Sequence, residues 1–383
     1  MSVTFRIKAS EAYGRRLDPH FHSPTFRMNR SRIESHRHLA MKGLCELSNE
    51  TWDKAQCFQD CFPYVETPKY LFHALRMEFC TKQFDQYSSG GNYPAITKED
   101  FRKIIIPLPS LSEQRKIVAE LDAAYAAKRA ADEKATKLLA SIDDMVLNEL
   151  GIAKLPKPDT SLSSRIFTVS AREVHNGRLD PIAYQSMRRQ FYKNVREGTY
   201  ETVRLGKVVD VDCCQTDSLD GLTYVGLENI NGSDGTYSPT GDKESISTAV
   251  LFRKGEILFP KLRPYLNKVW LADFDGAAST EFFPLIPTGV SAEYLIVYLR
   301  LTQVARVMTL LMTGNTLPRV QLEDVLSLPV PIPPRFVQDH IASVASSIRA
   351  EARKLKADAI AALEAAKRKI ENVVRETSKP YSL

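Results

Sequence analysis

Two long stretches of the chain place apolar residues at alternating three- and four-residue steps, which is the spacing of a heptad seam. Within residues 111–150 the seam runs through Ile117, Leu121, Ala124, Ala131, Ala135, Leu138, Ile142 and Met145. Within residues 334–376 it runs through Ile341, Ala345, Ile348, Ala352, Leu355, Ala359, Ala362, Ala366 and Val373. The pattern predicts two helices of about 35 to 40 residues each.

Two helices of matched length bury their apolar stripes best against each other, because no other predicted element is comparably long. Alanines in the seam allow close approach, and charged residues such as Lys134, Asp143 and Arg353 flank it. We therefore predict a helix pair. The alternative is that each helix packs only on its own domain.

Between the helical stretches the pattern is that of a mixed α+β domain. Short β-rich runs cover residues 203–211, 222–227, 256–259 and 268–271, with turn-forming sequences at 231–235 and 273–276. A shorter helix is predicted over residues 292–311. The predicted organisation is a first domain over 1–110, a helix over 111–150, a linker over 151–164, a second domain over 165–333, a helix over 334–376 and a tail over 377–383.

The two halves of the chain repeat each other in two separate blocks. In the first block, Phe5, Ala9, Glu11 and Arg16-Leu17-Asp18-Pro19 return as Phe167, Ala171, Glu173 and Arg178-Leu179-Asp180-Pro181. In the second block, Tyr70-Leu71, Leu75-Arg76, Gly90, Pro94, Asp100, Pro107, Pro109, Gln114 and Ile117 return as Tyr294-Leu295, Leu299-Arg300, Gly314, Pro318, Asp324, Pro331, Pro333, Gln338 and Ile341. The second block recurs at a greater distance, so the first copy lacks a segment that corresponds to about residues 229–291. Solenoid units recur every ~20 to 50 residues, so this longer repeat indicates two duplicated domains.

The composition predicts a globular protein in a reducing compartment. The chain has 383 residues, of which 43% are hydrophobic, and no apolar run long enough for a membrane helix or pattern of a signal peptide. Its six cysteines are few and include the adjacent pair Cys213 and Cys214, which disfavours a disulfide framework and favours the cytoplasm. A net charge of +6 permits a polyanionic partner without requiring one.

Several motifs together resemble the target-recognition domain of type I restriction-modification specificity subunits. They are Leu262-Arg-Pro-Tyr-Leu-Asn-Lys-Val269, Ser279-Thr-Glu-Phe282, Gly314-Asn-Thr-Leu-Pro-Arg-Val320 and Leu328-Pro-Val-Pro-Ile-Pro-Pro334 before the second long helix. The end of the first domain, residues 104–117, resembles the same family. The resemblance covers nearly the whole chain.

This resemblance implies a non-catalytic reader of double-stranded DNA without a cofactor. Two recognition domains would be held apart by two antiparallel helices, and each domain would read one half of a bipartite site. The helix pair would dock methyltransferase subunits, and translocase-nuclease subunits would join that assembly. The seam residues expected to hold the coiled coil and its docking surface are Ile117, Leu121, Leu138, Ile142, Ile341, Ile348 and Leu355.

A basic, proline-bounded loop in the second domain is the predicted DNA contact. It offers Lys261, Arg263, Tyr265, Asn267 and Lys268, which suit phosphate neutralisation and hydrogen bonding to base edges. Without the resemblance, such a loop is usually a solvated hairpin. Further DNA contacts are predicted at Ser279, Thr280, Asn315, Thr316 and Arg319. For Arg319, a surface salt bridge is an equally good interpretation.

Other candidate chemistry carries less weight. The residues Cys45, Cys57, Cys61, Cys80, His36, His38 and His73 do not follow a finger or ribbon spacing, so ordinary thiols are favoured and no metal is predicted. Asp18 and Asp180 each precede a proline, which is typical of turns. No nucleotide-binding, metalloprotease or adenine-methyltransferase motif occurs.

The chain departs from the family pattern in its first domain. The missing segment includes the counterparts of the loop 261–268 and of residues 279–281, so base reading by the first domain is in doubt. We therefore predict a DNA-specificity subunit with an intact second recognition domain and a shortened first one. The alternative is a degenerate scaffold that docks methyltransferase subunits without reading DNA.

Overall fold

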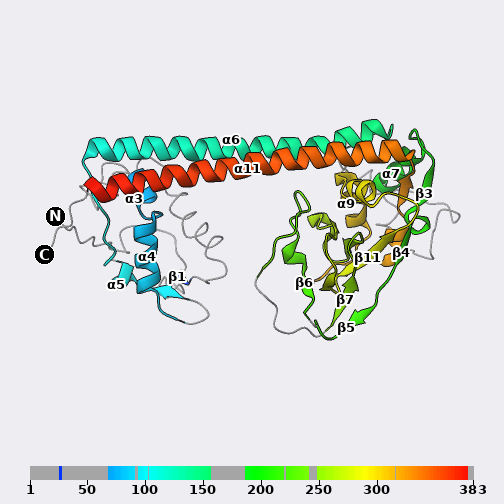
Figure 1. The fold of residues 1–383 in the computed structure, drawn as a ribbon, viewed down its shortest axis with the longest axis horizontal. Helices are drawn as coiled ribbons and strands as arrows, with labels where there is room; N and C mark the ends of the chain where they lie inside the picture. The colour runs from blue at the N-terminus through cyan, green and yellow to red at the C-terminus, as the bar shows by residue number, and fades with distance from the viewer. Residues whose placement is uncertain are drawn as a thin grey trace. The chain divides into compact units, whose positions relative to one another are not determined.

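The computed structural model describes residues 26–27, 68–90, 94–101, 103–156, 186–219, 221–240, 248–314 and 316–377. Contacts divide the chain into two compact units. The first unit comprises residues 1–132 and 355–383, and the second comprises residues 133–354. Two long helices, α6 (Leu111–Glu149) and α11 (Arg335–Thr377), contribute one part of their length to each unit (Figure 1).

Within the first unit, α6 and α11 pack against each other in antiparallel orientation. Ile117 and Leu121 share an apolar cluster with Ile370 and Val374. The ammonium nitrogen of Lys369 lies 2.6 Å from a carboxylate oxygen of Glu120, which places the end of α11 beside the start of α6. This exposed ion pair adds little to stability, since such pairs contribute ~0 to 1 kcal/mol.

Within the second unit the same two helices pack through Ile142 and Val146 of α6 and Ile341 and Ala345 of α11. The predicted helix pair is therefore confirmed. Of the predicted seam residues, Ile117, Leu121, Ile142 and Ile341 are buried, whereas Leu138, Ile348 and Leu355 are half-buried. Their role in docking a partner stays a prediction.

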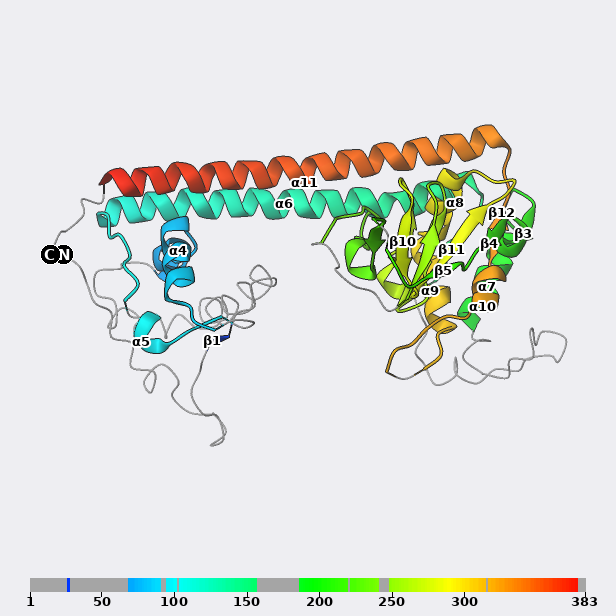
Figure 2. The ribbon, with the colours of Figure 1, turned by 60° about the horizontal axis from the view of Figure 1, so that its bottom comes forward.

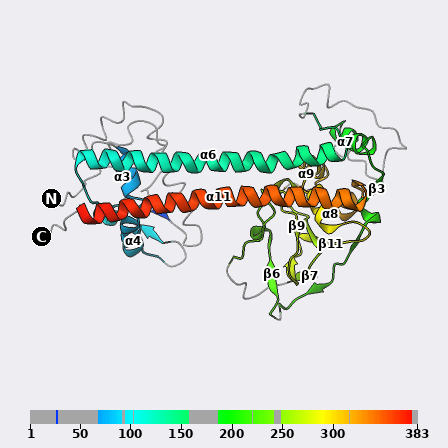
Figure 3. The same ribbon diagram turned by 45° about the horizontal axis from the view of Figure 1, so that its top comes forward.

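The first unit adds short elements to its part of the helix pair (Figure 3). These are β1 (Phe26–Arg27), α3 (Pro68–Ala74), α4 (Glu78–Tyr87), β2 (Ala95–Ile96) and α5 (Lys98–Phe101). Tyr70, Ala74 and Met77 pack onto the seam residues of α6 and α11. Strands β1 and β2 pair in antiparallel fashion, with Phe26 opposite Ile96.

The second unit combines helices with mostly antiparallel sheets, as the predicted α+β class requires (Figure 2). Its strands are β3 (Thr202–Arg204), β4 (Val209–Val211), β5 (Gln215–Thr216), β6 (Thr223–Val225), β7 (Ala249–Phe252), β8 (Ile257–Pro260), β9 (Trp270–Leu271), β10 (Gly276–Ser279), β11 (Phe282–Pro287) and β12 (Pro329–Pro331). Its shorter helices are α7 (Ser186–Arg196), α8 (Ala292–Leu299), α9 (Thr302–Leu310) and α10 (Leu322–Leu326), with 3-10 turns η5 (Leu205–Lys207), η6 (Leu227–Asn229) and η7 (Pro264–Leu266).

The strands form two four-stranded sheets, ordered β5-β7-β10-β6 and β4-β11-β8-β9, and a two-stranded sheet β12-β3. Strand β8 is buried along its whole length because it contributes to two cores. Ile257 and Phe259 face the cluster that includes α7, α8 and α9, whereas Leu258 faces the cluster between the two larger sheets. The loop that follows β8 is therefore attached to a strand fixed on both faces.

Two predicted elements differ in the structure. The run 203–211 is divided between β3 and β4, which belong to different sheets, by the turn η5. At that turn the chain passes close to Leu326, and a side chain at Gly206 would meet the Leu326 Cβ atom at 3.2 Å. The predicted helix 292–311 is also broken, at Arg300 and Leu301, where Leu301 has extended backbone. The Arg300 carbonyl instead accepts a hydrogen bond from the Asn267 side chain at 2.7 Å.

Residues repeated in the sequence make the same hydrogen bonds in both units. The Tyr70 hydroxyl donates to the Pro107 carbonyl at 2.7 Å, and the Tyr294 hydroxyl donates to the Pro331 carbonyl at 2.8 Å. In the same way Gln114 donates to Pro109 at 3.0 Å, and Gln338 donates to Pro333 at 2.8 Å. In each copy the tyrosine bond ties the proline-rich segment to a short helix, and the glutamine bond ties it to the long helix that follows.

Candidate nucleic-acid interface

Three predicted segments that are distant in sequence adjoin in the second unit. The loop 261–268 follows β8, and the Lys261 amide donates to the Glu281 carbonyl at 2.7 Å, beside Ser279 and Thr280. On its other side, the Val320 amide donates to the Lys261 carbonyl at 3.0 Å and the Arg263 amide to the Pro318 carbonyl at 3.3 Å. The backbone thus joins residues 261–263, 279–281 and 318–320 into one surface.

The loop has an unusual backbone. Arg263 and Asn267 flank the turn η7 and have φ angles of 50° and 52°, which are left-handed values. They are the two non-glycine residues with positive φ in the part of the chain that the structure describes. Such conformations cost about 1 kcal/mol or more, so the surrounding structure must hold them. The turn itself is closed by the Asn267 amide, which donates to the Pro264 carbonyl at 2.9 Å.

Some of the predicted DNA contacts are exposed. Arg263 is exposed, Tyr265 is 48% exposed, and Thr316 is exposed on the adjoining segment. Two aliphatic side chains on the same segments, Leu266 and Leu317, are 42% and 47% exposed. This part of the surface offers a guanidinium group, a phenol ring and a hydroxyl to solvent, which are groups suited to phosphates and bases.

Other members of the predicted set already have partners inside the protein. The Asn267 amide nitrogen donates to the Arg300 carbonyl at 2.7 Å, and the Lys268 ammonium group donates to the Leu227 carbonyl at 2.6 Å. The Lys261 ammonium group lies 4.5 Å from the centre of the Phe283 ring, and burial lowers the pKa of Lys261. These three side chains hold the loop in place as the structure stands.

Arg319 forms an ion pair with Glu281. Its Nε atom lies 2.8 Å from Oε2 and its Nη2 atom 2.5 Å from Oε1, a two-point contact between a guanidinium and a carboxylate group. Ser279 and Thr280 are half-buried, and the Glu281 amide donates to the Ser279 hydroxyl at 3.3 Å. Asn315 lies outside the described residues.

Arg300 is a residue of this region that sequence reasoning missed. Its side chain is 7% exposed, and it donates to the carbonyls of Asn267 and Val269 at 2.7 and 2.8 Å and to that of Gly232 at 2.9 Å. The only signal in the sequence was its place in the repeated pair Leu75-Arg76 and Leu299-Arg300. A repeated arginine is equally compatible with a surface position.

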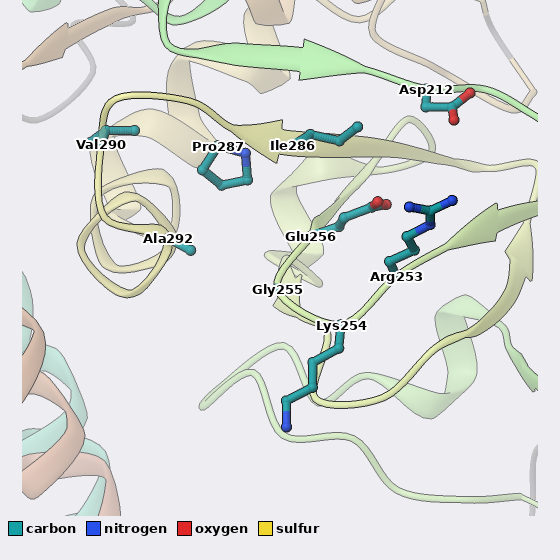
Figure 4. Close-up of a pocket in the computed structure, with 9 residues that line it drawn as sticks. All are labelled: Asp212, Arg253, Lys254, Gly255, Glu256, Ile286, Pro287, Val290 and Ala292. Atoms are coloured by element: carbon teal, nitrogen blue, oxygen red, sulfur yellow. The ribbon is translucent and has the colours of Figure 1, made fainter.

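A separate pocket of about 430 Å³ lies at the turn between β7 and β8 (Figure 4). Figure 4 shows Asp212, Arg253 and Glu256 at one end and Val290 and Ala292 at the other. Burial raises the pKa of Glu256. None of the predicted DNA contacts lines this pocket, so we do not assign it to the same surface.

Of the cysteines and histidines weighed as zinc ligands, Cys80 and His73 are described, and no group of three or more possible ligands occurs among the described residues. Among the described ones, Cys80 is buried with its Sγ atom 3.9 Å from the Ile105 carbonyl, and the His73 ring bonds to Asp122 at 3.0 Å. Cys45, Cys57, Cys61, His36 and His38 lie outside the described residues, as do Asp18 and Asp180.

No helix in the described part of the chain is both long and apolar enough to cross a membrane.

Comparisons with known proteins point to one class. Residues 43–137 match the family described as type I restriction modification DNA specificity domain. The chain is also 25% identical over 289 residues to the type I restriction enzyme EcoDI specificity subunit of Escherichia coli, covering 73% of this chain. The chain is therefore related to type I specificity subunits, as the motifs indicated. It spans 62% of the length of that relative.

Two solved structures that match most of the chain have low sequence identity to it. The HsdS subunit from Thermoanaerobacter tengcongensis is 18% identical, with a TM-score of 0.37, over 84% of this chain and 72% of that one. A chain from a structure on complex assembly and conformational transition of the type I R-M system is also 18% identical. Its TM-score is 0.48, over 83% of this chain and 72% of that one.

Proposed function

We propose that this chain is the DNA-specificity subunit of a type I restriction-modification complex. Its second unit reads double-stranded DNA with the surface formed by residues 261–268, 279–281 and 316–319. The observation that carries this proposal is the convergence of these segments, each part of a family motif, through backbone hydrogen bonds around Lys261. The relationship to the EcoDI specificity subunit supports the same function.

The proposed reading surface is anchored to a buried strand. Strand β8 is buried on both faces and leads directly into the loop, so the loop has a fixed origin. Function-bearing loops on a rigid scaffold are common in binding proteins, because the scaffold limits the entropy lost on binding. Arg263 and Tyr265 are then the side chains we assign to direct DNA contact, with Thr316 beside them.

In this proposal the chemistry belongs to partner subunits. Methyltransferase subunits dock on the helix pair formed by α6 and α11, and translocase-nuclease subunits join the assembly. The seam residues Ile117, Leu121, Ile142 and Ile341 support docking by fixing the helix pair, because their side chains are buried within it. The exposed faces of the helices are left for the partner.

A second candidate is a scaffold that docks methyltransferase subunits without reading sequence. The observation in its favour is that Asn267, Lys268 and Arg319 are occupied by partners within the chain. Fewer polar groups then remain for base edges, which are read through hydrogen bonds. The first unit, which lacks the counterpart of the loop, fits either candidate.

A binding experiment separates the two candidates. The full chain, assembled with type I methyltransferase subunits, is used to select duplexes from a random pool, and binding is then measured across a salt series. A specific reader enriches a defined sequence and binds it at least ~10³-fold more tightly than random duplex at equal salt. Enrichment of no sequence, with one salt-dependent affinity for all duplexes, would overturn the reading function and leave the scaffold.

A further inference from the structure

Arg300 joins three segments that the sequence keeps apart. It follows α8 directly, and its guanidinium group donates to Asn267 and Val269 at the end of the loop and to Gly232 in a distant turn. In return, the Asn267 side-chain amide donates a hydrogen bond to the Arg300 carbonyl. Two hydrogen bonds in opposite directions therefore connect Arg300 with Asn267, one of the two left-handed residues of the loop.

The bonding of this guanidinium group is unusual for a buried charge. Buried arginines are normally paired with carboxylates, whereas the hydrogen bonds described for Arg300 go to carbonyl oxygens. Burial lowers its pKa to about 9, so it stays protonated at neutral pH. An arginine is suited to this place because its donors form a fixed planar fork, which a lysine lacks.

The turn 231–235 is shaped to receive the arginine and the loop. Gly235 has a φ of +77°, and a side chain there would meet the Arg300 Cζ atom at 2.9 Å. At Gly232 a side chain would lie 2.1 Å from the Leu266 carbonyl oxygen. Because both positions exclude a Cβ atom, the turn packs directly on the guanidinium group and on η7.

The first unit supplies a comparison within the same chain. Arg76 is the sequence counterpart of Arg300, but the first copy lacks the counterpart of the loop. Arg76 is exposed, and its guanidinium carbon lies 5.2 Å from the Phe72 ring centre and 5.3 Å from that of Tyr125. The buried, carbonyl-bound arrangement thus occurs in the copy that has the loop.

We propose that Arg300 is a positioning residue that sets the conformation of the loop 261–268 and so the direction in which Arg263 and Tyr265 meet DNA. This inference rests on the proposed reading function. The physical reason is that two left-handed residues persist only if the surroundings hold them, and Arg300 bonds to one of them from both sides. Sequence discrimination then depends on a residue that touches no base.

The test compares Arg300→Lys with Arg76→Lys in the full chain assembled with its methyltransferase subunits. Lysine keeps the charge but not the planar fork, and Arg76 is the matched control. We expect Arg300→Lys to speed amide hydrogen exchange at Leu266 and Asn267 and to weaken binding to the selected duplex about tenfold, with little change on random duplex. Arg76→Lys should change neither quantity.

A second variant guards against a general loss of folding. Asn267→Gly removes the return bond to the Arg300 carbonyl and tolerates the left-handed backbone, and its loss of discrimination should not add to that of Arg300→Lys, because both act through one contact. Additive losses would overturn the proposal, as would faster loop exchange with unchanged discrimination, which would make Arg300 merely structural. If the wild-type complex binds all duplexes alike, the reading function itself fails, whereas the exchange comparison still decides whether Arg300 holds the loop.

Discussion

At the scale of single residues, the direction of each side chain divides the basic loop into two groups. Arg263 and Tyr265 face solvent, whereas Asn267 and Lys268 donate to backbone carbonyls of the same unit. A side chain that already satisfies a buried carbonyl can contact DNA only by leaving that group unpaired, which costs ~1 to 3 kcal/mol. The exposed side chains of the loop can contact DNA without this cost, so we expect them to be the DNA contacts.

This division predicts different outcomes for Arg263→Ala and Lys268→Ala. If Arg263 contacts a base, its removal should cost ~1 to 3 kcal/mol on the selected duplex and much less on random duplex. Lys268→Ala should leave the salt slope unchanged, because its ammonium group is bound to Leu227. Titrations of both variants across a salt series check this. A slope lowered by Lys268→Ala would show that the lysine turns outward to a phosphate.

The ion pair between Arg319 and Glu281 leads to a second prediction. Glu281→Ala removes the carboxylate but keeps the carbonyl that binds the Lys261 amide, so the loop should remain attached. The freed Arg319 should strengthen binding to all duplexes and steepen the salt slope by about one phosphate contact. The double variant with Arg319→Ala should remove this gain. A gain that survives in the double variant would assign it to the lost negative charge alone.

At the scale of elements, His73 connects α3 to α6 in the first unit. Its ring is buried, bonds to Asp122 at 3.0 Å and stacks on Tyr125 with ring centres 5.7 Å apart. Burial lowers the pKa of His73 below its ordinary 6.5, and the hydrogen bond to Asp122 opposes that shift. The folded unit therefore binds this proton less readily than the unfolded chain does.

The sign of the pH dependence follows from linkage. Stability contributed by neutral His73 is present above pH 6.5 and is lost as pH falls from 6.5 through the lower pKa of the folded state. In His73→Gln this component should be missing, so the opening free energy of α3 should depend less on pH. Amide hydrogen exchange of α3 at several pH values measures it. An equal pH dependence in both proteins would assign the effect to other groups.

The helix pair can be tested with a matched pair of substitutions on α6. Leu121 is 2% exposed, so Leu121→Asp buries an unpaired carboxylate and should destabilise the first unit by ~3 to 5 kcal/mol. Ala127→Asp places the same charge on the exposed face that we assign to the partner, so it should leave the unit folded and test that face directly. We expect the first variant to lose co-purification with methyltransferase subunits. Retention of the complex by an unfolded first unit would exclude the first-unit part of the helix pair as the docking element.

Sequence patterns predicted the elements whose residue spacing repeats within a short stretch of the chain. The long helices were predictable because their heptad spacing recurs over many turns, as at Ile117, Leu121 and Ile341. The break after α8 was not, because the Arg300 carbonyl is paired there with the side chain of Asn267, which is far away in the sequence. The position of the basic loop was predictable from its prolines and charges. The inward direction of Lys268 was not, since its partner Leu227 precedes it by many residues.

At the scale of the whole molecule, the two copies of the repeat differ in the segment that we propose to read DNA. The second unit has the loop 261–268 and the arginine beneath it, whereas the first copy lacks the corresponding segment and its Arg76 lies against aromatic rings. Discrimination comes from base contacts worth ~1 to 3 kcal/mol each, so a copy without the loop has few means of gaining it. The two halves of the chain should therefore differ in specificity while sharing a framework.

The assembled complex should accordingly recognise one defined half-site and show little preference at the other end. Mapping methylated adenines in the source genome, or sequencing duplexes selected by the complex, measures this directly. Grafting residues 229–291 into the first copy near Thr67 should then sharpen the second half-site, because the graft restores the loop. The same graft carrying Arg263→Ala is the matched control. Two equally sharp half-sites in the wild type would contradict this prediction. They would show that the remaining first-copy residues, or a second chain, read the other end, and that the argument from the missing segment is wrong.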